Sequence, residues 1–305
     1  MSVLALALTG AASVAALAAA RPGALDPAPS ARAFATAVEA VRAALAGSGS
    51  TGGVVAFGEL HQTRDTVRIP SALKRFETDI LPAVAERLSY LVVETWVTTG
   101  RCGEAEKAVT ADVERTTQRP ASTENEIEAV LRVAHERGIT PRILSISCAD
   151  YQAMRPAGGA VDYDRTLRVT ARALEAAVVR AVGETANRAP EAASPDGPRM
   201  VAVYGGALHN DLVPDPELAA YSFVPRVLAA TLGRFVEIDL VVPEYAAASA
   251  ATRAQPWWRA YVRTRRARGA AVLIRRSARS YVVVFPVHAV PAARGESPSR
   301  RESVR

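Results

Sequence analysis

The sequence contains very little cysteine and lysine, and each shortage excludes a class of protein. Cysteine occurs only at Cys102 and Cys148, outside any C-x-x-C pair, which argues against a zinc ribbon or a thioredoxin-like redox site. In an oxidising compartment these two cysteines either pair or remain separate small residues. Lysine occurs only at Lys74 and Lys107, so arginine carries the formal net charge of +6. No nucleic-acid motif accompanies the arginines, so we expect a solvated surface and no nucleic-acid partner.

Several catalytic signatures are also missing. The absence of G-x-S-x-G argues against the common serine hydrolase arrangement, and the absence of G-x-x-x-x-G-K-[ST] argues against a P-loop ATPase. Residues 47–52 match G-x-G-x-x-G, but they lie between an expected helix and the following strand. A dinucleotide-binding turn needs the opposite order, strand and then helix. No segment after residue 20 is long and apolar enough to span a bilayer.

The two ends of the chain differ in composition from its middle. Residues 1–20 carry no charged side chain and end in three alanines, which fits the cleavage pattern of an export signal. The alternative for this segment is a weak, uncleaved membrane anchor. Residues 21–30 are rich in proline and glycine and predict a linker, and residues 291–305 predict a disordered basic tail. We therefore expect an exported protein, periplasmic or secreted, or one associated weakly with a membrane through its N-terminus.

Between residues 31 and 290, short apolar runs alternate with segments of helical periodicity. The apolar runs predict strands at 53–58, 91–94, 142–146, 200–204 and 235–242. The periodic segments predict helices at 31–46, 70–88, 103–118, 123–137 and 163–182. Residues 271–274 and 281–285 flank a polar turn and predict a C-terminal β-hairpin. The sequence therefore predicts one α/β domain, with a mixed, largely parallel sheet and helices on both faces.

Two G-x-x-H motifs follow predicted strands. Gly58-Glu59-Leu60-His61 follows the apolar run 54–57, and Gly206-Ala207-Leu208-His209 follows the run 200–204. We expect the glycines to allow tight turns at the strand ends. Ligands bind at the edge of an α/β sheet where the carboxyl ends of its strands meet. Glu59 and the two histidines should therefore lie at the same edge.

Other polar and aromatic residues follow neighbouring strands. Glu94 ends the apolar run 90–93, where a carboxylate either points into a site or reaches the solvated edge of the sheet. Tyr151 follows the strand at 142–146 and is either a ligand-binding residue or a packed aromatic side chain. His135 lies on the charged side of a predicted helix and His288 follows the last strand, so we expect surface positions for both.

A cluster of imidazole and carboxylate groups supports two kinds of chemistry. His61, Glu94 and His209 are a plausible ligand set for a divalent transition metal. Such an ion would lower the pKa of a bound water from ~15.7 toward ~7. Without a metal, one histidine oriented by Glu59 or Glu94 would act as a general base on water. The sequence contains no H-E-x-x-H motif, so it leaves both possibilities open.

These motifs resemble those of a superfamily that joins erythromycin-esterase-like proteins, ChaN-like haem-binding proteins and the TraB/Tiki group. The resemblance covers roughly residues 50–290 and rests on V-V-A-F-G-E-L-H at 54–61, L-V-V-E-T at 91–95 and Y-G-G-A-L-H at 204–209. Paired G-x-x-H motifs are typical of the TraB/Tiki group, and G-E-x-H is typical of the other two branches. Some branches also use an arginine, for which this chain offers Arg64, Arg142 and Arg275.

The resemblance implies an α/β fold and a site, but the branches differ in function. One implication is an exported hydrolase, metal-dependent or metal-free, acting on a peptide or ester bond of a small molecule or peptide. Its catalytic residues would be Glu59, His61, Glu94 and His209. The alternative is a ChaN-like protein that binds haem or iron at the same edge through a histidine or Tyr151. A scaffold without chemistry is the third reading, and the oligomeric state stays open.

Overall fold

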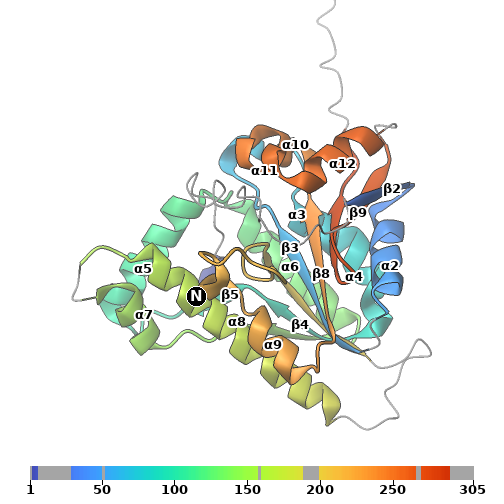
Figure 1. Ribbon diagram of the computed structural model, residues 1–305. Coiled ribbons are helices and arrows are strands. Elements are labelled where there is room, and N and C mark those ends of the chain that lie inside the picture. The colour runs from blue at the N-terminus through green and yellow to red at the C-terminus, as the bar shows by residue number, and fades with distance from the viewer. Residues whose placement is uncertain are drawn as a thin grey trace, which may run out of the picture.

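Eight strands form one sheet at the centre of the molecule (Figure 1). The structure is a computed structural model that describes residues 2–5, 29–49, 52–156, 159–187, 199–265 and 269–288. The strand order is β2-β9-β10-β8-β3-β7-β4-β6. The bounds are β2 Ser30–Phe34, β3 Gly53–Glu59, β4 Leu88–Val93, β6 Thr140–Ile143, β7 Met200–Gly206, β8 Phe235–Val241, β9 Ala271–Arg275 and β10 Ser280–Val284.

The strand directions confirm the predicted fold class. Every neighbouring pair from β10 to β6 is parallel, whereas β9 and β2 add two antiparallel strands. The predicted C-terminal hairpin is β9 and β10. It does not form the edge of the sheet, however, because β2 pairs with β9 on the outside.

Helices cover both faces of the sheet, because alternate residues of each buried strand point to opposite sides. On β3, Val55 and Phe57 belong to one apolar cluster, and Val54 and Ala56 belong to the other. The first cluster packs under α2 Ala37–Gly47, α3 Ala72–Arg75, η3 Phe76–Ile80, α4 Leu81–Val84 and α6 Ser122–Glu136. The second packs under α5 Gly103–Thr117, α7 Cys148–Met154, α8 Tyr163–Ala186 and α9 Val224–Ala230. In Figure 1, α8 and α9 lie on one side of the sheet and α2 on the other.

Three short helices, α10 Pro243–Ala248, α11 Ala250–Ala254 and α12 Pro256–Thr264, lie together at the top of the view in Figure 1. Trp257 and Trp258 of α12 pack against Val272 and Ile274 of the hairpin. These helices therefore extend the apolar covering of the sheet to β9 and β10.

Two predicted helices differ from the observed elements. The predicted helix 31–46 is a strand over its first residues, because Ser30–Phe34 pairs with β9. The helix begins only at Ala37, where the Thr36 side chain caps it by accepting the Glu39 N–H. The predicted helix 70–88 is interrupted by the π turn Phe76–Ile80. The following Pro82 lacks an N–H and crowds the preceding turn, which explains the wider winding.

The N-terminal residues of the structure form a second, small sheet. Strand β1, Ser2–Ala5, pairs antiparallel with β5, Thr95–Thr98, which directly follows Glu94. Most of the predicted export segment and linker, and the predicted tail 291–305, lie outside the described residues. No helix in the described part of the chain is long and apolar enough to cross a membrane.

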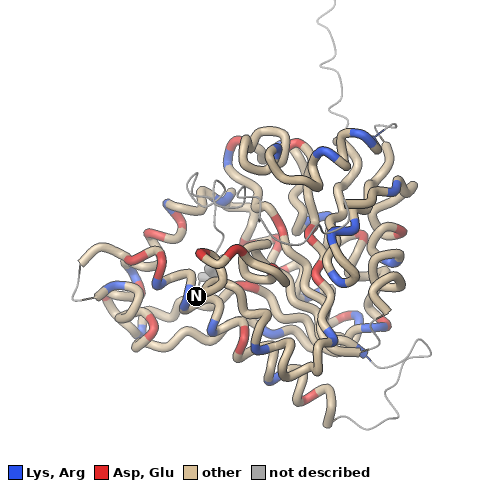
Figure 2. Tube along the Cα trace, viewed as in Figure 1, with Lys and Arg blue, Asp and Glu red and all other residues tan. Residues whose placement is uncertain are grey.

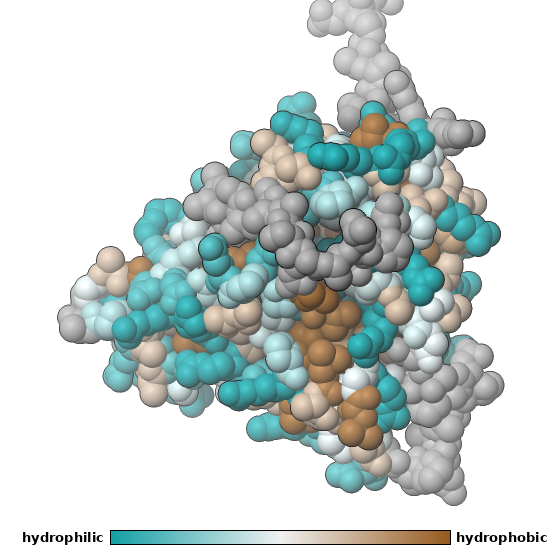
Figure 3. All heavy atoms as spheres, in the orientation of Figure 1, coloured by the Kyte–Doolittle hydropathy of each residue, from teal (hydrophilic) through white to brown (hydrophobic). Residues whose placement is uncertain are grey.

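The two cysteines lie at the starts of α5 and α7 and form a disulfide, with their Cα atoms 5.0 Å apart. This contact resolves the alternative that the sequence left open. Lys and Arg are interspersed with Asp and Glu over the outer elements (Figure 2). The face seen in Figure 3 is mostly hydrophilic, with a strip of apolar residues in the region of α9.

Candidate functional site

The strands that carry the two motifs and Glu94 are neighbours, in the order β3-β7-β4. Their register places Glu59 opposite Gly206 and Val93 opposite Tyr204. All three strands are parallel, so their carboxyl ends meet at one edge of the sheet. The structure therefore brings together Glu59, His61, Glu94 and His209, each at most 5% exposed.

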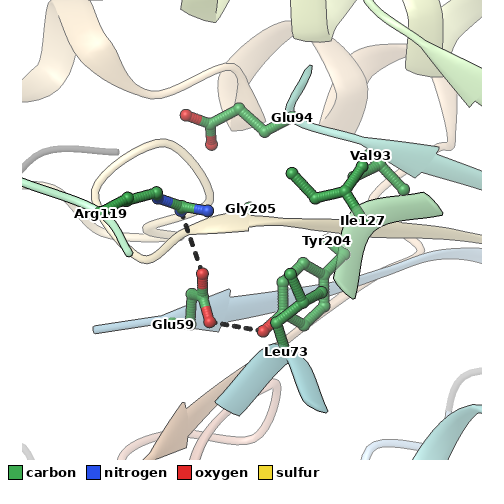
Figure 4. Close-up of a pocket in the computed structure, with 8 residues that line it drawn as sticks. All are labelled: Glu59, Leu73, Val93, Glu94, Arg119, Ile127, Tyr204 and Gly205. Atoms are coloured by element: carbon green, nitrogen blue, oxygen red, sulfur yellow. Dashed lines mark hydrogen bonds and ion pairs between the residues drawn. The ribbon is translucent and has the colours of Figure 1, made fainter. Parts of the chain in front are cut away.

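Glu59 and His61 form the first carboxylate–imidazole pair. Glu59 Oε1 lies 2.5 Å from His61 Nδ1, and the Tyr204 hydroxyl donates to Glu59 Oε2 at 2.6 Å. The Arg119 guanidinium donates to Glu59 Oε1 at 3.1 Å and also contacts the His61 ring. Figure 4 shows Arg119 entering from its loop between the Glu59 and Glu94 carboxyl groups. Both oxygens of Glu59 are therefore held by donors.

The protonation of this pair follows from its surroundings. Burial opposes the charge of Glu59, but His61, Arg119 and Tyr204 outweigh it and hold the pKa of this carboxyl below its ordinary value. Burial and the charge of Arg119 lower the pKa of His61 to about 4, although Glu59 acts in the opposite direction. At neutral pH the pair is therefore an ionised carboxylate and a neutral imidazole whose Nδ1–H points at it.

Glu94 and His209 form the second pair. The Gly206 N–H donates to Glu94 Oε2 at 2.8 Å, and Glu94 Oε1 lies 3.6 Å from His209 Nε2. His209 Nδ1 lies 2.7 Å from the Tyr221 carbonyl oxygen, which only accepts, so Nδ1 carries the hydrogen and Nε2 the lone pair. Glu94 Oε1 and His209 Nε2 have no hydrogen-bond partner among the described residues. The two atoms therefore face one another across a short gap.

Burial moves the pKa values of this second pair in opposite directions. It raises the pKa of Glu94 to about 8, partly offset by the Gly206 N–H, and lowers the pKa of His209 to about 4. Glu94 is therefore protonated at neutral pH while His209 is neutral. The two carboxyl groups of the site thus differ: Glu59 is ionised and Glu94 holds a proton.

The glycines of the motifs are required for space and not for turns, which corrects the expectation from the sequence. Gly58 lies inside β3 and Gly206 ends β7, and neither has a positive φ. A Cβ on Gly205 would lie 2.3 Å from Glu94 Oε2, and one on Gly206 would lie 2.9 Å from His61 Nε2. Gly205 and Gly206 therefore leave room for the side chains of Glu94 and His61.

Asn210 connects the two motifs, a role that the sequence did not indicate although Asn210 follows His209 directly. Its side chain is buried just after His209. With the amide oriented so that both ends are satisfied, Nδ2 donates to the carbonyls of Gly206 and Ala207 at 3.2 and 2.9 Å. In this orientation Oδ1 accepts from the Gly58 N–H at 3.2 Å. One side chain thus fixes the ends of β3 and β7 relative to each other.

The arginine of the site is Arg119, which none of the three predicted candidates matches. Arg142 instead pairs with Glu184 at 2.8 Å, whereas Arg275 is exposed on β9 and Arg64 begins the short helix η2, Arg64–Thr66. Arg119 lies between α5 and α6, after a helix that ends at a left-handed Gln118. Its only signal in the sequence is an arginine before a proline between two helices, and this pattern says nothing about contacts.

The remaining predicted residues lie elsewhere. Tyr151 is buried in the apolar cluster that contains Trp96 and Met154. No hydrogen bond or ion pair of the described residues joins it to the paired histidines. His135 is exposed on α6, and His288 is partly exposed, with its backbone N–H donating to Glu244. The structure therefore gathers four of the five predicted site residues.

A divalent ion would find two of its three predicted ligands in place. The 3.6 Å between Glu94 Oε1 and His209 Nε2 suits two donors that each lie about 2.0–2.2 Å from one ion. His61 does not complete the set, because the Arg119 guanidinium contacts both of its ring nitrogens and repels a second cation. Within the described ranges, no group of three or more His, Cys, Asp or Glu side chains is arranged to hold a metal ion.

The space between these residues is small. A cavity of about 10 Å³ lies among Glu59, Glu94, Arg119 and Tyr204, with the apolar side chains of Leu73, Val93 and Ile127 in its wall (Figure 4). This volume is close to what a single water molecule occupies. A haem group needs a large apolar slot beside its axial ligand, and this cavity does not provide one.

Comparison with known proteins adds little to this description. The sequence matches no known family profile and no curated protein. Among solved structures, the chain is similar to that of the type III effector HopBA1, with 15% sequence identity and a TM-score of 0.34. That match covers 71% of this chain and 88% of the effector chain. A likeness of this degree supports no argument about the site, so the superfamily resemblance stays a prediction.

Proposed function

We propose that this protein is an exported hydrolase that cleaves a peptide or ester bond by general acid–base catalysis. The observation that carries the proposal is the pairing of Glu59 with His61 and of Glu94 with His209 on adjoining strand ends. Environments that separate the protonation states of two carboxyl groups supply an acid and a base at one site. The water-sized cavity lies beside both carboxyl groups and Arg119.

The proposed base is His61. Ionised Glu59 accepts the Nδ1–H and fixes the ring. Once Arg119 moves from the His61 ring onto the substrate, His61 Nε2 can take a proton from a water molecule as the water attacks the substrate carbonyl carbon. The carbonyl oxygen gains the negative charge, which the Arg119 guanidinium stabilises. Collapse of the tetrahedral intermediate breaks the bond to the leaving group.

The proposed acid is Glu94. Its protonated carboxyl group gives a proton to the leaving amine or alkoxide, and the proton on His61 then replaces the one that Glu94 lost. His209 Nε2 faces the Glu94 carboxyl across 3.6 Å, so a small approach of the two groups would let His209 accept the Glu94 proton and orient the carboxyl. Because the four side chains are at most 5% exposed, a substrate reaches them only after a covering segment moves. The segment between β7 and α9 carries both His209 and Tyr221, whose carbonyl oxygen accepts from His209. We expect this segment to be the one that moves.

The disulfide supports the export part of the proposal. A bond between Cys102 and Cys148 persists in oxidising compartments and is rare in the cytosol. It agrees with the export signal that the sequence predicts at residues 1–20.

Alanine substitutions of the histidines test the proposal, with p-nitrophenyl esters and quenched fluorescent peptides as probes. We expect His61→Ala to lower kcat/KM by about 10²–10⁴-fold, since it removes the general base. His209→Ala should lower kcat with a smaller change in KM. His135→Ala is the matched control, because this histidine is exposed on α6, and it should keep full activity.

Three results would count against the mechanism. Equal activity of His61→Ala and His135→Ala would show that His61 is not the general base. The absence of hydrolysis by the wild-type chain would show that the protein does not catalyse the proposed reaction. If a chelator abolished the activity and Zn²⁺ or Mn²⁺ restored it, Glu94 would not be the general acid. Glu94 and His209 would then be ligands of a metal ion. Circular dichroism of each variant establishes that the fold is retained.

A further inference from the structure

Strand β5 continues directly from the site. Glu94 ends the buried strand β4, and Thr95–Thr98 follows it as β5. One side of β5 faces the segment after β6, where the Leu144 N–H donates to the Thr95 carbonyl at 2.7 Å. The other side carries β1, with Ala5 opposite Thr95 and Ser2 opposite Thr98. The partner on this second side is therefore a short extended piece of chain.

The backbone groups that hold this partner follow from strand geometry. Along a strand, the N–H and C=O of successive residues point alternately to the two sides. Since the Thr95 carbonyl faces Leu144, the backbone groups of Trp96 and Thr98 face β1. Leu4 lies opposite Trp96 and exchanges hydrogen bonds with it, whereas the N–H of Val3 faces away from β5.

The strand is held rigidly at its far end. The Glu106 carboxylate accepts the backbone N–H groups of Thr99, Gly100 and Cys102 at 2.5, 3.0 and 2.9 Å. The disulfide then joins Cys102 to Cys148 of α7. The Trp96 side chain is 1% exposed in the core beneath the strand. This edge therefore keeps its shape whatever pairs with it.

We propose that the side of β5 that pairs with β1 in this structure binds an extended segment of a polypeptide substrate, antiparallel, and delivers the following residues to Glu94. This inference rests on the proposed hydrolase function and narrows its substrate class to peptides. An extended peptide that adds a strand to a sheet edge gains affinity from main-chain hydrogen bonds. Strand β1 shows that the edge accepts such a segment. Its pairing defines the direction of the bound segment and which of its residues face β5 with their backbone groups.

The direction of β1 fixes which part of the substrate binds. The chain runs from Ser2 at Thr98 to Ala5 at Thr95, the residue after Glu94. A substrate in the same place approaches the Glu94 carboxyl group with its C-terminal end. Strand β5 therefore binds residues on the N-terminal side of the bond to be cleaved. In the full-length chain β1 occupies this place, and removal of the predicted export signal 1–20, which contains β1, would open it to a substrate.

Binding of a fluorescein-labelled peptide with the sequence of residues 2–9 tests the inference in the full-length chain. Leu4→Pro removes the donor to β5, so it should free the edge and tighten binding of the peptide by roughly tenfold. Val3→Pro is the matched control, because its N–H faces away from β5, and it should bind like wild type. Fluorescence anisotropy measures both.

A second measurement changes only the peptide. N-methylation at the leucine that matches Leu4 should weaken binding to the Leu4→Pro chain roughly tenfold, whereas N-methylation at the valine that matches Val3 should not. Equal binding of the two methylated peptides, or equal binding by the Leu4→Pro and Val3→Pro chains, would overturn the proposed docking edge. If the peptides bound with this pattern but no peptide were hydrolysed, the docking edge would be supported and the hydrolase function would be rejected.

Discussion

At the scale of single residues, a cluster of buried charged groups lies on β8, outside the site. Glu237 and Asp239 point to the same face of the sheet, and Arg276 donates to both, at 2.5 and 2.8 Å. Burial raises the pKa of Glu237 to about 8 and that of Asp239 to about 6, although Arg276 opposes both shifts. One arginine therefore compensates two carboxyl groups that cannot both ionise without cost.

This cluster predicts a pH dependence of stability that Glu237→Gln should remove. The folded protein keeps the Glu237 proton up to a pH of about 8, whereas the unfolded chain releases it near the ordinary glutamate pKa of about 4.3. The stability that the neutral group contributes is therefore fully present below that value and is lost as the pH rises toward 8. The free energy of unfolding should fall by up to about 1.4 kcal/mol per pH unit more in wild type than in the variant.

Urea unfolding between pH 4 and pH 9 measures this difference. The two stability curves should run parallel at the acid end and diverge as the pH rises, with the variant gaining relative to wild type. Curves that stay parallel over the whole range would show that Glu237 ionises at the same pH in the folded and the unfolded chain.

The residues of the site were only partly predictable. Glu59, His61, Glu94 and His209 could be placed together because each follows an apolar run and the carboxyl ends of parallel strands converge. Arg119 could not, because it reaches the site from a loop between two helices that no periodicity describes. Asn210 stands next to His209 in the sequence, but its bridging contact depends on how closely β3 and β7 approach.

At the scale of elements, the site depends on the close approach of Glu94, directly after β4, to the backbone of the neighbouring strand β7. The Glu94 side chain passes over Gly205, where an added Cβ would lie 2.3 Å from Glu94 Oε2 and 2.8 Å from Glu94 Cβ. The backbone of β7 cannot retreat, because it is paired with β3 on one side and with β4 on the other. The Glu94 side chain would therefore have to move.

Gly205→Ala should consequently destabilise the fold and displace Glu94. We expect a loss of about 1–3 kcal/mol, as for other overpacked core positions, together with a loss of hydrolytic activity. Gly183→Ala in α8 is the control, because a Cβ there meets nothing within 4 Å and alanine favours a helix by up to about 1 kcal/mol. Urea denaturation measures the stability of both variants. A Gly205→Ala variant as stable as wild type would show that Glu94 and β7 can accommodate the added methyl group.

The elements themselves were predictable where periodicity was strong. Helices α5 and α8 and strands β3, β7 and β8 match runs that the sequence shows clearly. Strand β2 was missed because its short run precedes a helix directly and forms only through pairing with β9, far along the chain. The π turn Phe76–Ile80 was missed because a single proline changes the winding without breaking the apolar pattern.

At the scale of the whole molecule, the disulfide is the longest-range covalent constraint among the described residues. It joins the start of α5 to the start of α7 across 46 positions of the sequence. The segment that it closes contains α5, Arg119, α6 and β6, so it carries the site arginine. Closing a loop of this length lowers the entropy of the unfolded chain and contributes about 4 kcal/mol in the chain-entropy treatment.

Reduction should therefore lower the melting temperature of the whole molecule by on the order of 10 °C. Calorimetry of the wild-type chain with and without dithiothreitol measures the effect. The double variant Cys102→Ser/Cys148→Ser should melt at the reduced wild-type temperature and should not respond to dithiothreitol, since no disulfide remains to be broken. If the reductant left the wild-type melting temperature unchanged while free thiols appeared, the closed segment would be held by packing alone. Arg119 would then owe its place at Glu59 to the contacts of α5 and α6 and not to the covalent bond.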